Sequence, residues 1–270
     1  MISVAALYQK LEERIPPSLS CDWDNDGMMC CPLPERPSQR VLVTLDITDL
    51  SVSYAVAHHF DAVVSHHPLL FRGIRHLEPG DAVARKTIDL CRAGIAAFSF
   101  HTRLDALPGG VNDTLADCLG LTGVTPFGTG PVMMGRIGEY SCASATEFAR
   151  HVARRLHTSG VLLSDAGRPV RRVAILGGEG GDEWEAARSC GADTYVSGRI
   201  GYHRMMDAPE AGINLIEAGH YSTEFPVCYT LERWIREISP ESYTEVFSGN
   251  EGRIQCISES LTASDTPSCH

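Results

Sequence analysis

The sequence predicts an α/β protein built from two similar α/β domains that arose by internal duplication. Short apolar runs rich in strand-forming residues alternate with segments at helical spacing, as is typical of βαβ units. Strands are expected at residues 41–45 and 61–65, and again at 173–176 and 193–197. Each pair spans 24 positions from its first residue to its last. The equal spacing indicates a duplication, although α/β units in general share part of this pattern.

The remaining elements follow from local patterns along the chain. Val4, Leu7, Leu11 and Ile15 recur at helical spacing and predict an amphipathic first helix. After its second strand, each unit continues through a further helix, an Ala-Gly-Ile tripeptide and another apolar strand. These third strands end in the motifs HTRLD, at 101–105, and HYSTE, at 220–224.

Turn signals suggest where the domains begin and end. Residues 107–113 predict a turn into a helix that is capped by Asn112 or Asp113. The Gly/Pro-rich stretch 128–131 is interpreted as a domain junction. We therefore expect a first domain at 1–127, completed by a C-terminal segment at about 220–257, a second domain at 128–219, and a polar tail at 258–270.

Composition excludes several classes of protein. The chain has 270 residues, 43% of them hydrophobic, which is ample for a packed core and excludes global disorder. The net charge of −11 disfavours non-specific binding to nucleic acid or to anionic membranes. No apolar run approaches the length of a membrane span, and no secretion signal is recognised. The ten cysteines contain no C-x-x-C pair, so we expect reduced thiols in a cytoplasmic protein rather than a cysteine zinc site.

Three histidine motifs, each at the end of an expected strand, point to metal binding. A single motif is a weak signal, because His58-His59 is a similar pair with no expected role and a histidine four residues from a carboxylate is commonly structural. Together the motifs supply enough imidazoles and carboxylates for two divalent ions sharing one carboxylate. Two such ions would generate a bridging hydroxide and polarise a substrate oxygen. The ligands, without sulfur, suit zinc, iron, manganese or cobalt, and the motifs are His66-His67, His101 with Asp105, and His220 with Glu224.

Two further stretches carry weaker signals. The acidic segment 22–28 lacks the spacing and the distal glutamate of a calcium loop, so we interpret it as a tight turn that presents polar groups toward the site. The glycine run 177–181 is similar to phosphate-binding loops but lacks the P-loop lysine.

Several of these motifs occur in an order that closely resembles one known family. They are WDNDGMM, VLVTLDIT, VVSHHPLLF, HTRLD, GGVND, YVSGRIGYH and AGHYSTE, and they extend from about Asp22 to Pro226. The chain resembles the YbgI/YqfO dinuclear-metal-centre proteins, the NIF-three-like family, some of whose members are named GTP cyclohydrolase type 2 homologues.

The resemblance implies a fold, an assembly and a ligand set. The fold is a two-domain α/β fold with internal similarity, without the third domain that is inserted in longer relatives. The assembly is a toroidal homohexamer with metal sites facing its interior. The implied metal ligands are His66, His67, Asp105, His220 and Glu224. Among them Asp105 is implied to bridge the two ions. His101 is implied to be either a further ligand or a neighbour of the centre.

Four arginines leave two interpretations open. Arg103 and Arg199 stand where many relatives carry other residues, and Arg72 and Arg75 follow the His-His-Pro turn. These side chains would suit an anionic substrate, or they would pair with the excess carboxylates of the chain.

The leading functional hypothesis is a dinuclear metal-dependent hydrolase acting on a nucleotide or another phosphorylated small molecule. His101 or His203 would move protons, and the attacked atom would be the purine C8 if the cyclohydrolase name applies. The rival is a non-catalytic metal-handling protein, a metallochaperone or a regulatory ring protein, with the same ligands. Nucleic-acid binding within a ring is a third hypothesis, which the net charge disfavours.

Overall fold

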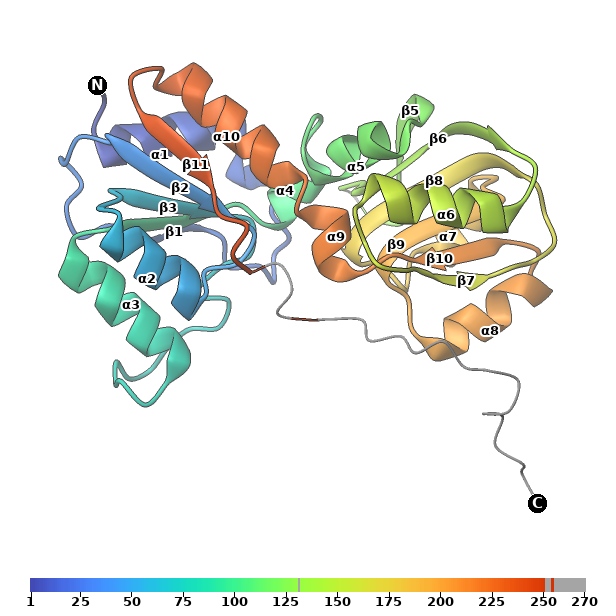
Figure 1. Ribbon diagram of the computed structural model, residues 1–270, viewed down its shortest axis with the longest axis horizontal. Coiled ribbons are helices and arrows are strands. Elements are labelled where there is room, and N and C mark those ends of the chain that lie inside the picture. The colour runs from blue at the N-terminus through green and yellow to red at the C-terminus, as the bar shows by residue number, and fades with distance from the viewer. Residues whose placement is uncertain (131, 251–253, 255–270) are drawn as a thin grey trace.

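The computed structural model describes residues 1–130, 132–250 and 254, and it contains two β-sheets, each flanked by helices (Figure 1). The predicted polar tail at 258–270 lies outside these described residues. The two-domain α/β fold predicted from the sequence is confirmed.

The first sheet has five strands, and all but one of its neighbouring pairs are parallel. The antiparallel pair is at one edge. The segment after residue 240 returns to the opposite edge as the last strand. In spatial order the strands are β1 (Gly27–Cys30), β4 (Ala96–Ser99), β3 (Ala62–Ser65), β2 (Arg40–Thr44) and β11 (Tyr243–Val246).

The second sheet has six strands with a parallel centre of β8, β9 and β10. The other three strands pair antiparallel to their neighbours. In spatial order the strands are β5 (Thr122–Phe127), β6 (Gly135–Cys142), β8 (Val170–Glu179), β9 (Thr194–Arg199), β10 (Asn214–Glu217) and β7 (Leu162–Ser164).

The duplication extends to the strand register. In the first sheet Val41 pairs with Ala62 and Thr44 with Ser65, and the residues 132 positions later pair in the same way, Val173 with Thr194 and Leu176 with Ser197. The third strand of each set, β4 or β10, also has an antiparallel edge strand as its outer neighbour. Because a slip of one residue would move every side chain to the other face, the matched register supports a common origin.

Helices cover both faces of each sheet (Figure 1). In the first unit, α1 and α10 share one core cluster with the strands, while α2 and α3 share another on the other face. In the second unit, α5 and α6 share one cluster, and α7 and α8 share another. The helices are α1 (Val4–Arg14), α2 (Asp49–Ala57), α3 (Ala82–Ala93), α4 (Thr102–Ala106), α5 (Val111–Leu119), α6 (Ala145–Arg155), α7 (Trp184–Ser189), α8 (Tyr202–Glu210), α9 (His220–Glu224) and α10 (Val227–Ile238), with a 3-10 turn η1 (Pro17–Leu19).

Two local expectations from the sequence are wrong. Helix α5 is capped by Gly110 without a side-chain hydrogen bond, rather than by Asn112 or Asp113. A Cβ on Gly110 would lie 2.0 Å from the Leu104 carbonyl oxygen, so the tight turn from α4 requires glycine there. The stretch beginning at Gly128 follows β5, which already pairs with β6 of the second sheet, so it is a loop within that sheet and not a junction between sheets.

The structure also describes the state of the cysteines and the length of the helices. The eight cysteines that the structure describes are all free thiols. Among the described helices, none has the length and apolarity required to cross a bilayer.

Candidate metal centre

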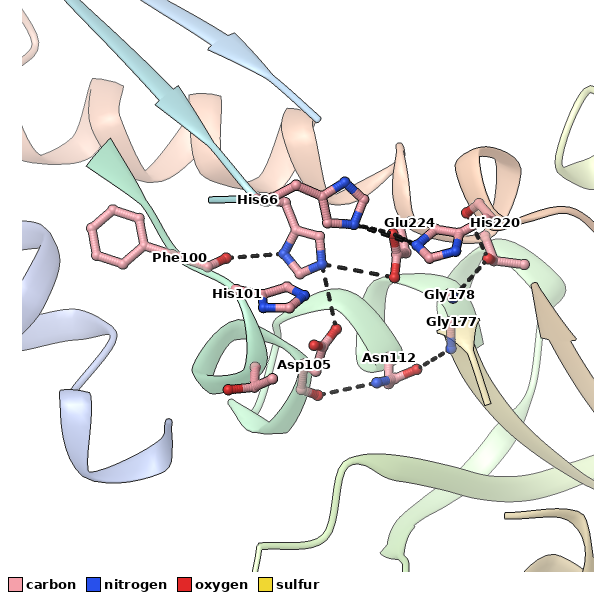
Figure 2. Close-up of polar contacts among 12 residues, drawn as sticks. His66, Phe100, His101, Asp105, Asn112, Gly177, Gly178, His220 and Glu224 are labelled. Atoms are coloured by element: carbon pink, nitrogen blue, oxygen red, sulfur yellow. Dashed lines mark hydrogen bonds and ion pairs between the residues drawn. The ribbon is translucent and has the colours of Figure 1, made fainter. Parts of the chain in front are cut away.

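The predicted ligands follow the carboxyl ends of strands from both sheets. His66 and His67 come directly after β3, His101 separates β4 from α4, and the short helix α9 follows β10 of the other sheet. Figure 1 shows α9 between the two sheets, and Figure 2 shows its His220 and Glu224 facing His66, His101 and Asp105 of the first unit. Both units therefore contribute to one cluster, in the position where α/β sheets bind ligands.

Three overlapping groups in this cluster have the geometry to hold a metal ion. Within each group the candidate ligand atoms all lie within 4.8 Å of one another. Glu224 belongs to two groups and Asp105 to one, so the shared carboxylate in this structure is Glu224, whereas the resemblance implied Asp105. The groups are His66 with His67 and His101, His67 with His220 and Glu224, and His66 with Asp105 and Glu224.

The ligand atoms converge without satisfying one another. Glu224 Oε2 lies 3.0 Å from the Nε2 atoms of both His67 and His220, yet it is buried without a partner in hydrogen-bond geometry among the described residues. His66 Nε2 is likewise buried and unpartnered there, 3.7 Å from Asp105 Oδ1 and 3.8 Å from Glu224 Oε1. Buried polar atoms are normally paired, so two unpartnered atoms within the candidate ligand groups fit divalent cations held by nitrogen and oxygen.

Acceptors outside the cluster fix the orientation of three imidazoles. His66 Nδ1 lies 2.9 Å from the Phe100 carbonyl oxygen, His67 Nδ1 lies 2.8 Å from Asp46 Oδ1, and His101 Nδ1 lies 2.9 Å from Asp24 Oδ1. A proton on each Nδ1 leaves the Nε2 lone pair free to bind a metal. Asp46 was missed in the sequence, although it lies just after β2 and so at the same sheet edge.

The acidic loop presents its carboxylates toward the site, as predicted. Asp24 accepts hydrogen bonds from both the backbone N–H and the hydroxyl of Thr102, at the start of α4. Asp26 accepts from the backbone N–H of His101 at 3.1 Å. Burial alone would raise the pKa of Asp24, but its hydrogen bonds from His101 and Thr102 hold that pKa well below the usual range.

Burial and opposite charges shift the ionisation of the cluster in different directions. Burial raises the pKa of Asp105 to about 6. Burial opposes the charged form of His67, but the Asp46 and Glu224 carboxylates outweigh it and raise the pKa of His67 to about 10. For Glu224, the facing imidazoles of His220, His66 and His67 overcome burial and hold the pKa well below its ordinary value. Without an ion, the positive charge of protonated histidines balances the ionised carboxylates, so metal binding would release protons from these histidines.

Comparison with known proteins places the chain in a family. The family model described as Duf34/NIF3 (NGG1p interacting factor 3) matches residues 2–250. The chain belongs to the Duf34/NIF3 family. This confirms the resemblance found in the sequence.

One curated relative and two solved structures illustrate the similarity. A Clostridium perfringens protein named GTP cyclohydrolase 1 type 2 homolog is 29% identical over 233 residues, which cover 84% of this chain and 88% of the relative. The crystal structure of a Staphylococcus aureus hypothetical protein has a TM-score of 0.87 at 24% identity, covering 95% of this chain and 99% of that one. The structure of protein ybgI, of unknown function, has a TM-score of 0.82 at 23% identity, covering 91% and 98%. These structures share the fold.

In this NIF3-family chain the glycine run allows close approach rather than phosphate binding. Gly178 has a φ of +65°, and a Cβ there would lie 2.0 Å from Glu224 Oε1. Its N–H donates to Thr223 Oγ1, and the N–H of Gly177 donates to Asn112 Oδ1. Because Asn112 Nδ2 also donates to the Asp105 carbonyl oxygen, this buried amide joins a candidate ligand residue of one unit to β8 of the other (Figure 2).

Replacing Gly178 by alanine should destabilise the fold and weaken metal binding together. Gly191→Ala is the matched control, because Gly191 also has a positive φ, +86°, but no atom within 4 Å of the added Cβ. We expect Gly191→Ala to cost about 1–2 kcal/mol of unfolding free energy and to leave metal affinity unchanged. Gly178→Ala should cost more than that and lower the affinity, as measured by urea unfolding and metal titration. Equal effects of the two variants would contradict the close-packing argument.

Arg103 and Arg199 differ in their burial and in their pairing with carboxylates. Arg103 is only 1% exposed, and its guanidinium lies against Asp26, Glu12 and the Ile15 carbonyl oxygen. The hypothesis that Arg103 faces an anionic substrate is therefore wrong, and the pairing with carboxylates is confirmed. Arg199 is 69% exposed, with its nearest carboxylate, that of Glu179, at 4.0 Å.

The other candidates are exposed side chains. Arg72 and Arg75 are exposed and line a cavity of about 500 Å³ that includes Phe71, Glu78 and Asp81. His203 is exposed on α8, and its ring contacts that of Tyr202, 5.5 Å away between centroids. The three groups found among the described residues do not include it.

Removing the Asp46 carboxylate should loosen the metal centre without dismantling it. Asp46→Ala leaves His67 Nδ1 without its acceptor, and losses of such outer partners typically weaken metal affinity by about 10- to 100-fold. Asp49→Ala is the control, because Asp49 forms an exposed ion pair with Arg85 and belongs to none of the ligand groups found in the described part of the chain. Competition with a chromophoric chelator measures both. Wild-type affinity in Asp46→Ala would show that the His67 orientation does not depend on this acceptor.

Proposed function

We propose that this NIF3-family protein is a metal-dependent hydrolase that binds two divalent ions and acts on a nucleotide or another phosphorylated small molecule. The observation that carries the proposal is Glu224, whose two oxygens face two different groups of histidine and carboxylate ligands. A carboxylate shared between two cation positions would hold the ions near each other, as in two-metal sites, where they lie about 3.5–4 Å apart.

The ligand groups suggest how the ions would be divided. His67, His220 and Glu224 would hold one ion, and His66 with Asp105 and the other Glu224 oxygen would hold the second. Zinc, iron, manganese and cobalt all suit this mixture of imidazole and carboxylate. When bound, such ions supply Lewis-acid polarisation of a substrate oxygen and lower the pKa of a coordinated water.

The protein groups around the ligands would position the substrate and move protons. His101 lies beside His66 and His67, and Asp24 fixes its Nδ1. We therefore assign proton transfer at Nε2 to His101 rather than to His203, which belongs to none of the groups found among the described residues. The exposed Arg199 is the last residue of β9, which contacts α9, and it would attract an anionic substituent of the substrate.

We further propose that the protein is a toroidal homohexamer located in the cytoplasm. The family membership and the free thiols of the described chain support these two assignments. Light scattering in solution tests the assembly, because a monomer or dimer at working concentration would contradict it.

Metal content and turnover test the proposed activity together. Protein purified without chelators should carry about two ions per chain by mass spectrometry. It should hydrolyse GTP or a member of a small phosphoester panel at a rate that follows metal content. Rapid transfer of the ions to a chelator without turnover would favour the metal-handling alternative. Absence of metal after reconstitution would refute both.

A further inference from the structure

Two exposed aromatic side chains lie beside the metal centre. Trp23 is 64% exposed and Phe71 is 44% exposed. Their ring centroids lie 6.2 Å apart, and each ring stands edge-on to His101, at 6.2 Å for Trp23 and 6.1 Å for Phe71. The three rings therefore form a corner that we call the aromatic wall, defined by Trp23, Phe71 and His101.

The aromatic wall adjoins the candidate ligand nitrogens directly. The ring of His101 lies 5.2 Å from that of His66 and 5.7 Å from that of His67. A single imidazole thus separates Trp23 and Phe71 from the ligand groups. A molecule of nucleotide size with one end at the cluster can place another part against these rings.

The segments that carry Trp23 and Phe71 are held in place while the rings stay exposed. Cys21 N–H donates to Thr102 Oγ1 at 3.0 Å, and Asp24 is anchored to the same threonine, so both sides of Trp23 are tied to α4. The Asn25 amide donates to the Leu70 carbonyl oxygen, which joins this loop to the residue before Phe71.

Such anchoring indicates that the rings are displayed for a ligand. Trp184 and Trp234 are both buried, as is usual for so large an apolar surface. An indole that points into water from a pinned backbone forgoes the stabilisation of burial and is preorganised for contact. Phe71 also lines the cavity of about 500 Å³, which offers room for substituents of a bound ring.

We propose that Trp23 and Phe71 bind the planar heteroaromatic ring of the substrate, so that the protein selects nucleotides over phosphoesters that lack a base. This inference rests on the proposed function for the reacting end of the substrate, and it adds the part of the protein that recognises the base. Aromatic side chains bind nucleobases through their π faces with little regard to base identity, so selection among bases falls to other groups.

Paired ligands that differ only in the base test the aromatic wall. Guanosine 5′-monophosphate and ribose 5-phosphate are titrated calorimetrically into the metal-loaded full-length protein. We expect the nucleotide to bind at least about tenfold more tightly. Trp23→Ala should remove about tenfold of nucleotide affinity and leave ribose 5-phosphate unchanged, whereas Trp23→Phe should retain most of it. Tyr202→Ala, which removes another exposed aromatic ring, is the control and should change neither affinity.

Tryptophan quenching supplies a second readout. Because Trp23 is the exposed tryptophan, nucleotide binding should protect it from acrylamide, and Trp23→Phe should abolish this protection. Equal affinity for the two ligands, or equal losses for both in Trp23→Ala, would overturn the inference. The inference would also be overturned if Trp23→Ala changed the molar mass of the protein in solution but left its nucleotide affinity unchanged. That result would mean that a second copy of the chain covers Trp23.

Failure of the inference and failure of the hydrolase proposal have different signatures. Nucleotide binding that depends on Trp23 without any turnover would refute the hydrolase and retain the aromatic wall. The opposite result is metal-dependent turnover at equal rates in wild type and Trp23→Ala, for phosphoesters with a base and for those without one. It would retain the hydrolase proposal and refute the role of the aromatic wall.

Discussion

Glu224→Gln is expected to lower metal affinity at both positions of the cluster by more than about 100-fold. Losing a direct ligand should exceed the 10- to 100-fold effect typical of an outer partner. Glu224 contributes to two ligand groups, whereas Asp105 contributes to one. Asp105→Asn should therefore release one ion more readily than the other. Asp105→Ala should release the same ion and, because the proposed hydrolysis requires both ions, abolish hydrolysis. Metal content by mass spectrometry and chelator competition measure each variant.

Glu179→Gln is the matched control for this experiment. Glu179 is exposed and pairs loosely with Arg199, and it belongs to none of the groups found in the described chain. The control should retain wild-type metal content. If Glu224→Gln also retained both ions, the shared-carboxylate arrangement would be refuted.

Arg103→Met should destabilise the protein by about 3–5 kcal/mol, the range typical of removing one partner of a buried ion pair. The substitution leaves Asp26 without its guanidinium partner at 2.9 Å, and it removes hydrogen bonds to Glu12 and to the Ile15 carbonyl oxygen. Since Asp26 also accepts from the backbone N–H of His101, part of the loss should reach the metal centre. Urea unfolding with metal bound and with metal removed measures the two contributions.

Arg199→Met is the control for the Arg103 substitution. Arg199 is exposed, so its replacement should change the free energy of unfolding by less than about 0.5 kcal/mol. Its effect should instead appear as a higher KM for an anionic substrate. A stable Arg103→Met variant would mean that Asp26 finds another partner or water, and the assigned burial cost would be wrong.

Local patterns in the sequence were sufficient to predict the two-domain α/β fold and to indicate candidate ligands. Strand and helix periodicity is a short-range property, so the matched spacing of residues 41–65 and 173–197 indicated the duplication that the strand registers confirm. Histidines and carboxylates at strand ends indicated a cluster, because the carboxyl ends of neighbouring parallel strands meet at one edge. The motifs at 101–105 and 220–224 were informative because each follows the third strand of its unit. The first leads into the short helix α4, and the second forms the short helix α9.

Only the tertiary structure decided which neighbours these residues have. Asp46 contacts His67 across 21 positions of sequence, and Asp24 contacts His101 across 77. Arg103 binds Asp26, which is also 77 positions away, instead of facing the site. Gly178 faces Glu224 because two sheets and α9 pack together, so its role is invisible in a glycine run. Such contacts depend on how core packing places whole helices and strands, and this placement results from the interactions of many residues. Periodicity determines which face of an element is buried, but only packing determines what that face meets.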